Sequence, residues 1–158
     1  MNPFIQFFKD FFSNYMLMCA ICGWFIAQIA KTIINLFNKE KTSFWTLIFS
    51  NGGMPSSHSA TVTALCTACC IKYSAASPLF AISLIVACVV MIDASGVRYE
   101  TGKQAQILNK IAKEIFSGKT EEFNTGLKEL VGHTPFQVLV GALVGIAVAV
   151  VMSFIMTI

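Results

Sequence analysis

Long apolar stretches alternate with short polar connections along most of the sequence. Stretches 15–37 and 136–158 are each long enough to cross a bilayer, which needs about 20 helical residues. Stretch 79–92, together with its flanking residues, is nearly long enough to span the bilayer. Stretch 59–71 is shorter and rich in Ala, Thr and Cys. Small side chains of this kind suit packing against other helices rather than contact with lipid. The pattern predicts about four membrane-spanning helices.

Two further segments are apolar without being long enough to span. Residues 1–14 place phenylalanine and isoleucine side chains around Lys9 and Asp10, which predicts an amphipathic helix in the membrane interface. Residues 44–49 are also too short to cross, so we expect them either to lie in the interface or to re-enter the membrane.

One long hydrophilic region precedes the last apolar stretch. Its apolar side chains recur at helical spacing at Ile107, Leu108, Ile111 and Ile115. We expect Gly118 to end this helix and Thr120 to begin another. The whole pattern predicts an all-α fold, a polytopic membrane helix bundle with interfacial and cytoplasmic helices. It forms one integral membrane domain, residues 1–158, in which 96–132 is a cytoplasmic hydrophilic helical segment.

Composition supports a membrane protein. The 158 residues are 56% hydrophobic and 12% charged, whereas soluble domains carry about twice that charged fraction. All six cysteines lie in apolar runs, where free cysteine behaves as a small hydrophobe, so we expect neither disulfides nor a metal site. The sequence has no P-loop or nucleic-acid motif, and we expect no nucleic-acid partner.

The distribution of cations predicts the orientation. With four spans, Lys9 and Lys72 lie on one side of the membrane. The other side carries Lys39, Lys41, Arg98, Lys103, Lys110, Lys113, Lys119 and Lys128. The positive-inside rule places the second group in the cytoplasm and both ends of the chain outside. We expect a bacterial-type cytoplasmic membrane, with the polar clusters described next at its cytoplasmic face.

The first polar cluster surrounds His58. Pro55 suits the first turn of a helix, and Ser56 and Ser57 then offer hydroxyls and N–H groups at a helix N-terminus, which favours anions. Gly53 lets the backbone approach a ligand closely. A histidine beside bound phosphate can donate a proton to a leaving oxygen. The plainer alternative is a helix cap with an incidental histidine.

The second histidine, His133, stands just before another predicted helix start. Thr134 is a good N-cap and Pro135 a good first helical residue. Gln137, four residues after His133, could reach back to orient its ring. The alternative is an interfacial histidine near the lipid headgroups.

Arg98 follows the third apolar stretch, and its guanidinium can fork onto phosphate oxygens. Lys103 could add a point charge on the same helix, and Asp93 could either pair with Arg98 or orient a histidine. The alternatives are a positive-inside anchor for Arg98 and a solvated charge for Lys103.

Taken together, two histidines, an arginine and a serine-rich helix start suit phosphoryl transfer without a metal. One histidine would attack phosphorus, the second would protonate the leaving group, and cations would hold the charged oxygens. The paired carboxylates of a two-metal phosphatase are scarce, since three of the eight acidic residues lie together in one polar segment.

Three motifs resemble a known superfamily, that of the type 2 phosphatidic acid phosphatases and vanadium haloperoxidases. Pro55-Ser56-Ser57-His58 resembles its Pro-Ser-Gly-His signature, and residues 132–142 resemble its third motif, a histidine before a helix of small residues. With residues 93–98 and 102–109, the pattern is similar to the divergent small-membrane branch of that superfamily. The resemblance covers roughly residues 15–158.

The resemblance implies a helical membrane fold and a phosphohistidine mechanism. By it, His133 is the nucleophile and His58 the general acid, while Arg98 and the backbone of Ser56 and Ser57 hold phosphate. The superfamily's first motif, a lysine followed at a distance by Arg-Pro, has no counterpart here. Leu127 and Gln137 stand where the third motif carries arginine and aspartate.

The leading hypothesis is therefore metal-independent hydrolysis of a lipid phosphate or pyrophosphate, by a phosphoric monoester or pyrophosphate hydrolase with no cofactor. Its expected partners are membrane lipids and the lipid phosphate substrate, and vanadate is the expected inhibitor. The alternative is a non-catalytic protein that binds or transports a phosphorylated lipid in the same cationic pocket. A third reading, a small structural membrane subunit, predicts no phosphate site. A homodimer remains open.

Overall fold

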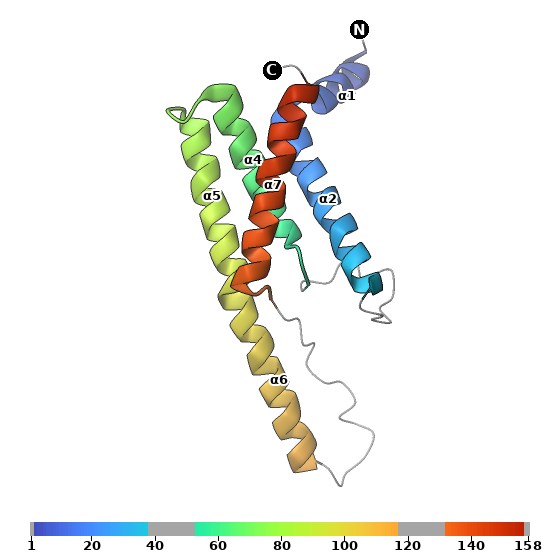
Figure 1. The fold of residues 1–158 in the computed structure, drawn as a ribbon, viewed down its shortest axis with the longest axis vertical. Coiled ribbons are helices and arrows are strands. Elements are labelled where there is room, and N and C mark those ends of the chain that lie inside the picture. Colours follow the sequence, from blue (N-terminus) through green and yellow to red (C-terminus); the bar gives the residue numbers. More distant parts are fainter. Residues whose placement is uncertain (1, 38–52, 117–131, 157–158) are drawn as a thin grey trace.

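The computed structural model describes residues 2–37, 53–116 and 132–156, and within these ranges every regular element is a helix (Figure 1). The helices are α1 (Pro3–Ser13), α2 (Tyr15–Phe37), α4 (Ser57–Tyr73), α5 (Pro78–Ser95), α6 (Val97–Phe116) and α7 (Pro135–Ile155). The predicted all-α membrane fold is confirmed. The segment 44–49, Gly118 and the helix expected from Thr120 lie outside the described residues.

Local sequence explains where the helices begin. Asn2, Ser56, Ser77 and Thr134 are N-caps whose side chains accept hydrogen bonds from the first turns of α1, α4, α5 and α7. Three of these helices also have proline at their first position, where its missing N–H is not needed. The capping signals at Ser56 and Thr134 place His58 and His133 at the same end of the bundle (Figure 1).

The inner helix of the bundle is α4, which packs against α7, α2 and α5. Its buried face consists mainly of Ser, Ala, Thr and Cys, as the small side chains of stretch 59–71 predict. Gly145 of α7 faces the Ala60 carbonyl and the Thr63 hydroxyl so closely that a Cβ there would collide with both. The Thr63 hydroxyl also donates to the Ala142 carbonyl (3.1 Å), which joins the two helices directly.

Three helical stretches are long and apolar enough to cross a membrane: Tyr15–Phe37, Pro78–Ala112 and Pro135–Ile155. The middle stretch runs from α5 into the first part of α6. With 17 residues, α4 is shorter than these three stretches and is not among the candidate spans, although it runs alongside them (Figure 1). The predicted count of about four spans thus corresponds to three lipid-facing helices around a shielded fourth.

The end of the bundle near both chain termini is closed by close packing. Tyr15, Cys19, Ala64, Ala68 and Ala149 form a buried cluster, which three methionines extend. The Tyr15 hydroxyl donates to the Ala149 carbonyl (3.0 Å), so α2 is tied to α7 at this end. All six cysteines are free thiols on α2, α4 and α5.

Candidate functional site

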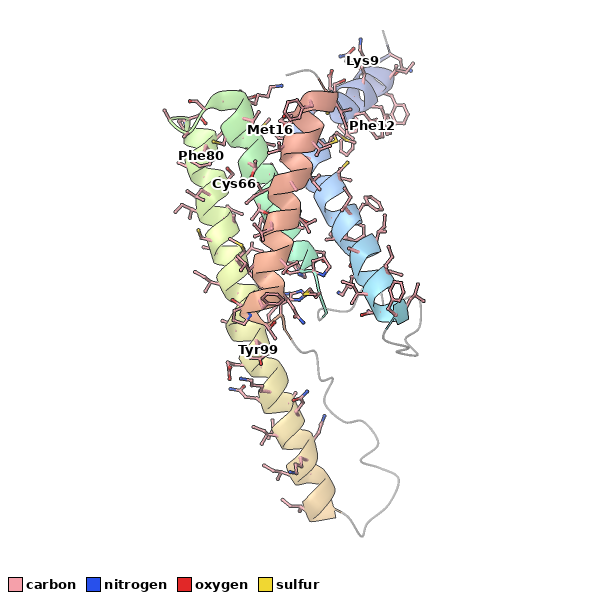
Figure 2. The ribbon with its side chains drawn as sticks, viewed as in Figure 1. Lys9, Phe12, Met16, Cys66, Phe80 and Tyr99 are labelled. Atoms are coloured by element: carbon pink, nitrogen blue, oxygen red, sulfur yellow. The ribbon has the colours of Figure 1, made fainter. Side chains whose placement is uncertain are left out.

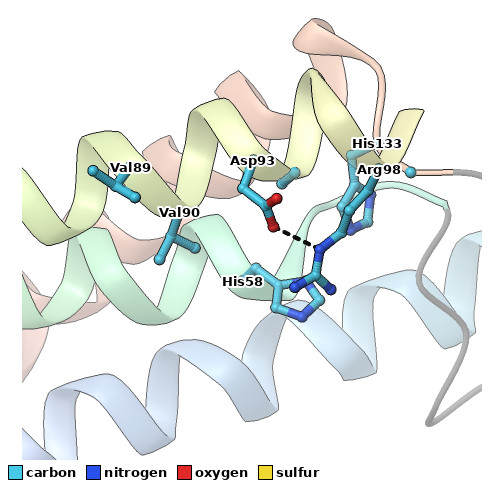
Figure 3. Close-up of a pocket in the computed structure, with 8 residues that line it drawn as sticks. His58, Val89, Val90, Asp93, Arg98 and His133 are labelled. Atoms are coloured by element: carbon cyan, nitrogen blue, oxygen red, sulfur yellow. Dashed lines mark hydrogen bonds and ion pairs between the residues drawn. The ribbon is translucent and has the colours of Figure 1, made fainter. Parts of the chain in front are cut away.

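The two histidines converge at the other end of the bundle. His58 lies in the first turn of α4 and His133 lies two residues before α7, and their ring centroids are 5.9 Å apart with the rings inclined at 63°. A single phosphate can contact both rings at this separation, because each in-line approach to phosphorus takes about 3 Å. Figure 3 shows both side chains at one cavity.

Backbone hydrogen bonds hold the segment that carries His133. The His133 N–H donates to the Ala94 carbonyl at the end of α5 (3.0 Å), and the Ser56 N–H donates to the Gln137 carbonyl (3.1 Å). Gly132 lies directly against the backbone of Arg98, where a Cβ would collide. The starts of α4 and α7 are therefore fixed to each other and to the junction of α5 and α6.

The cavity between these segments has a volume of about 290 Å³. It is lined by His58, Val89, Val90, Asp93, Ala94, Arg98, Gly132 and His133. One end is polar, with the two imidazoles and the guanidinium. The other end is an apolar wall formed by Val89 and Val90 of α5 (Figure 3).

Arg98 reaches the cavity as an ion pair with Asp93. Its Nε lies 2.6 Å from Asp93 Oδ2, and the two side chains are 50% and 40% exposed. A pair this open to solvent adds little stability. Because the pair engages Nε, the terminal nitrogens of the guanidinium are not part of it and can face an anion. Of the two roles predicted for Asp93, pairing with Arg98 is confirmed.

His133 is 2% exposed, and neither ring nitrogen has a hydrogen-bond partner among the described residues. Burial, and then the charges of Lys31 and His58, lower its pKa from 6.5 to about 4, so the ring is neutral at pH 7. Gln137 and the backbone of Gly53 act on this pKa in the opposite direction. A buried imidazole without partners is costly, and a ligand that supplies a partner would relieve that cost.

Lys31 is a buried cation near the site that was not among the predicted site residues. A lysine near the end of a spanning helix usually extends toward the headgroups. Here Lys31 is 1% exposed and its chain packs on Gly53, where a Cβ would lie 3.0 Å from Lys31 Cε. Its charge acts on both His58 and His133. The available signal was the lysine itself, since an ionisable residue within a spanning segment often marks a functional site.

The predicted serine ligands are part of the helix start rather than of the cavity lining. Ser56 is fully buried, and its Oγ accepts from the Ser59 N–H (3.4 Å) and from the Ser59 hydroxyl (3.1 Å). Ser57 is also buried. Gly53 has a φ of 90°, a conformation that favours glycine, and it packs on Lys31. Phosphate binding by these three residues stays a prediction.

Two other predicted residues have partners outside the cavity lining, and the orienting role of Gln137 toward His133 stays a prediction. The Gln137 side chain closes a capping box, in which its Oε1 accepts from the Thr134 N–H (3.0 Å). The ammonium of Lys103 pairs with Glu100 (3.0 Å) and lies 4.3 Å from the centre of the Tyr99 ring. Lys103 is absent from the cavity lining, so its role as a phosphate ligand gains no support.

These features define a small helical integral membrane protein with a histidine-lined cavity at one end of its bundle. The chain belongs to the Divergent PAP2 family, to which residues 12–148 match. It is also 37% identical over 155 residues to the uncharacterized membrane protein YuiD of Bacillus subtilis (strain 168), over 92% of this chain and 98% of that protein. No solved structure matches the chain. The resemblance predicted from the motifs is confirmed, and the three motifs lie within the matched residues.

Proposed function

We propose that the chain is a membrane-embedded phosphohydrolase that cleaves a lipid phosphate or pyrophosphate without a metal, through a phosphohistidine on His133. The observation that carries this proposal is the pair of imidazoles, 5.9 Å apart across one cavity. Membership of the Divergent PAP2 family supports phosphatase-like chemistry. The low pKa of His133, about 4, keeps a lone pair available for attack at neutral pH.

The reaction has two steps. A ring nitrogen of neutral His133 forms a bond to phosphorus, while the bond to the leaving oxygen breaks and its electron pair goes to that oxygen, which takes a proton from His58. Water then attacks the phosphohistidine, and the N–P bond breaks with its electron pair returning to His133. His58 takes the proton of that water, so phosphate leaves and both rings regain their starting states.

Cations at the cavity suit the charge of this reaction. The guanidinium of Arg98 lines the cavity, and Asp93 holds it by Nε. Lys31 adds a buried positive charge that acts on both imidazoles. Preorganised positive groups in a partly dry site stabilise a five-coordinate phosphate more than they do in water. Arg98 is the group to which we assign the phosphate oxygens, and Asp93 is its positioning residue.

The apolar wall of the cavity supports a lipid as the organic part of the substrate. Val89 and Val90 belong to a membrane-spanning stretch, and Val89 is 61% exposed on the surface that lipid would cover. A phosphate at the polar end would therefore have an acyl or isoprenoid chain beside α5. The charge distribution of the sequence supports a site that faces the cytoplasm of a bacterial-type membrane.

The test is phosphate release by the purified chain in lipid vesicles, with a panel of lipid phosphates and pyrophosphates. We expect turnover that vanadate inhibits and a His133→Ala variant that is slower by at least about a thousandfold, because the nucleophile is lost. Lys110→Ala is the matched control, since Lys110 lies exposed on α6 away from the cavity. If no substrate in the panel releases phosphate and vanadate does not bind, the proposed activity is wrong.

A specific observation favours a second candidate, a protein that binds or transports a lipid phosphate without cleaving it. Gln137 occupies the position of the orienting aspartate, and its amide oxygen is engaged by the Thr134 N–H. The His133 ring thus lacks the carboxylate that would stabilise its charged form. Vanadate binding without any phosphate release would select this alternative, and His133→Ala would then change affinity alone.

A further inference from the structure

We propose that α1 anchors the bundle in a phospholipid interface on the side of the chain termini, and that this anchor does not require anionic headgroups. The proposal is independent of the phosphate site, which lies at the opposite end of the bundle. Its first support is the arrangement of side chains on α1, which is divided into an apolar and a polar face.

The apolar face of α1 consists almost entirely of phenylalanine. Its large exposed side chains are Phe4, Ile5, Phe7, Phe8 and Phe12. Their spacing of three and four residues places them along one side of the helix. Neighbouring rings also contact one another, with the Phe4 and Phe8 centroids 4.8 Å apart and the Phe11 and Phe12 centroids 5.3 Å apart. The face is therefore a continuous aromatic surface.

The polar face of α1 has no net side-chain charge. Lys9 and Asp10 contribute one charge of each sign, and the Gln6 amide donates to Asp10 Oδ1 (2.7 Å) along this face. Lys9 and Phe12 are labelled on α1 in Figure 2. Interfacial helices that depend on anionic lipid usually carry several lysines or arginines on the polar face. Binding by α1 therefore depends on apolar burial, whatever the headgroup charge.

The position of α1 identifies lipid as the occupant of the aromatic surface. No residue of α1 is buried. Among the described helices, α1 packs appreciably only against α2. A single residue, Asn14, separates it from the membrane-spanning α2, and the Asn14 side chain caps that helix by accepting from the Leu17 N–H (3.2 Å). The last turn of α7 lies at the same level of the bundle as α1 (Figure 1), and its Phe154 and Ile155 are exposed apolar side chains. The aromatic face is thus joined to the surface that the bilayer already covers.

The experiment places single tryptophans on the two faces of α1 in the full chain, with Trp24 and Trp45 replaced by phenylalanine. Phe8→Trp and Phe4→Trp report on the apolar face, and Gln6→Trp is the matched control on the polar face. Each variant is reconstituted in phosphatidylcholine vesicles whose acyl chains carry bromine, which quenches tryptophan. Since the apolar face of an interfacial helix lies about 5–10 Å inside the headgroup boundary, we expect Phe8→Trp and Phe4→Trp to lose at least about half of their emission and Gln6→Trp far less.

Replacing about a third of the phosphatidylcholine by phosphatidylglycerol should leave this contrast unchanged. Equal quenching of both faces would overturn the proposed orientation. Lack of quenching on the apolar face would overturn lipid as its occupant and favour a second copy of the chain. Quenching that appears only with phosphatidylglycerol would overturn the claim that the anchor does not require anionic headgroups.

Discussion

The two ends of the bundle differ in how their buried side chains are used. Near the termini, Tyr15 and Cys19 are buried among alanines, and the Tyr15 hydroxyl has a hydrogen-bond partner. At the other end, Lys31 and His133 are buried in a polar setting, and the nitrogens of His133 have no partner among the described side chains and backbone. One end is closed by packing, and the other keeps a buried imidazole beside a cavity.

This contrast indicates that one end of the bundle contributes mainly to stability and the other end mainly to chemistry. An unpartnered buried imidazole costs free energy, whereas a buried tyrosine with a partner contributes it. The inner helix α4 joins the two ends, because its small residues pack against α7 along its length while His58 sits at its start. Substitutions at the cavity should therefore change activity, and substitutions near the termini should change stability.

After His133→Ala, the variant Arg98→Ala is expected to cause the largest loss of activity. Loss of the guanidinium should lower kcat/KM by about a hundredfold, because a charge-assisted contact to phosphate is lost. Asp93→Asn should lower it less, since the guanidinium keeps its charge but loses the ion pair that positions it. The measurement is phosphate release at several substrate concentrations, compared with Lys110→Ala.

If kcat/KM falls as much in Lys110→Ala as in Arg98→Ala, the activity depends on the overall positive charge near the membrane and not on the position of Arg98 at the cavity. Arg98→Lys sharpens the test, because lysine keeps the charge without the fork and should restore only part of the activity.

The next effect concerns pH. Since the nucleophile must be neutral and the pKa of His133 is about 4, the acid limb of kcat/KM should lie near pH 4 instead of near 6.5. At pH 5 the neutral fraction is then about 90% rather than about 3%, a difference of about thirtyfold. The check is a pH profile between 4 and 8, corrected for the ionisation of the substrate. A limb centred near 6.5 would mean that the ring is solvated in the working protein.

The smallest effect is expected at the closed end. Tyr15→Phe removes the hydrogen bond to the Ala149 carbonyl and should lower the free energy of unfolding by about 1 kcal/mol, roughly a fivefold change in the equilibrium. Unfolding in mixed micelles measures this change, and kcat should stay as in the parent protein. A loss of activity at unchanged stability would contradict the division between the two ends.

Much of this arrangement was predictable from sequence because its signals are local. The caps at Ser56 and Thr134 and the apolar stretches fix where helices begin, and the order of the helices then brings His58, Arg98 and His133 to one end. The pairing of Asp93 with Arg98 was one of two predicted options, and the structure selects it.

The features that could not be predicted from the sequence depend on which side of a helix faces the interior of the bundle. The helix α2 is apolar over most of its surface, so its pattern does not show that Lys31 is buried against Gly53. The same holds for α5, where nothing in the pattern distinguishes Val89 and Val90 from the other apolar residues. Gln137 was predicted to orient His133, and the capping box engages only its Oε1, so this orienting role stays a prediction.

The direct packing of α4 on α7 has a consequence for how the protein is made. The inner helix carries serine and threonine on its buried face, and much of its cover comes from α7, which is later in the chain than every other described helix. During synthesis the polar face of α4 is therefore exposed to lipid until α7 has been synthesised and has inserted beside it. Because His133 immediately precedes α7, the same late arrival completes the cavity, so a chain arrested before this helix would lack both the cover of α4 and the second imidazole.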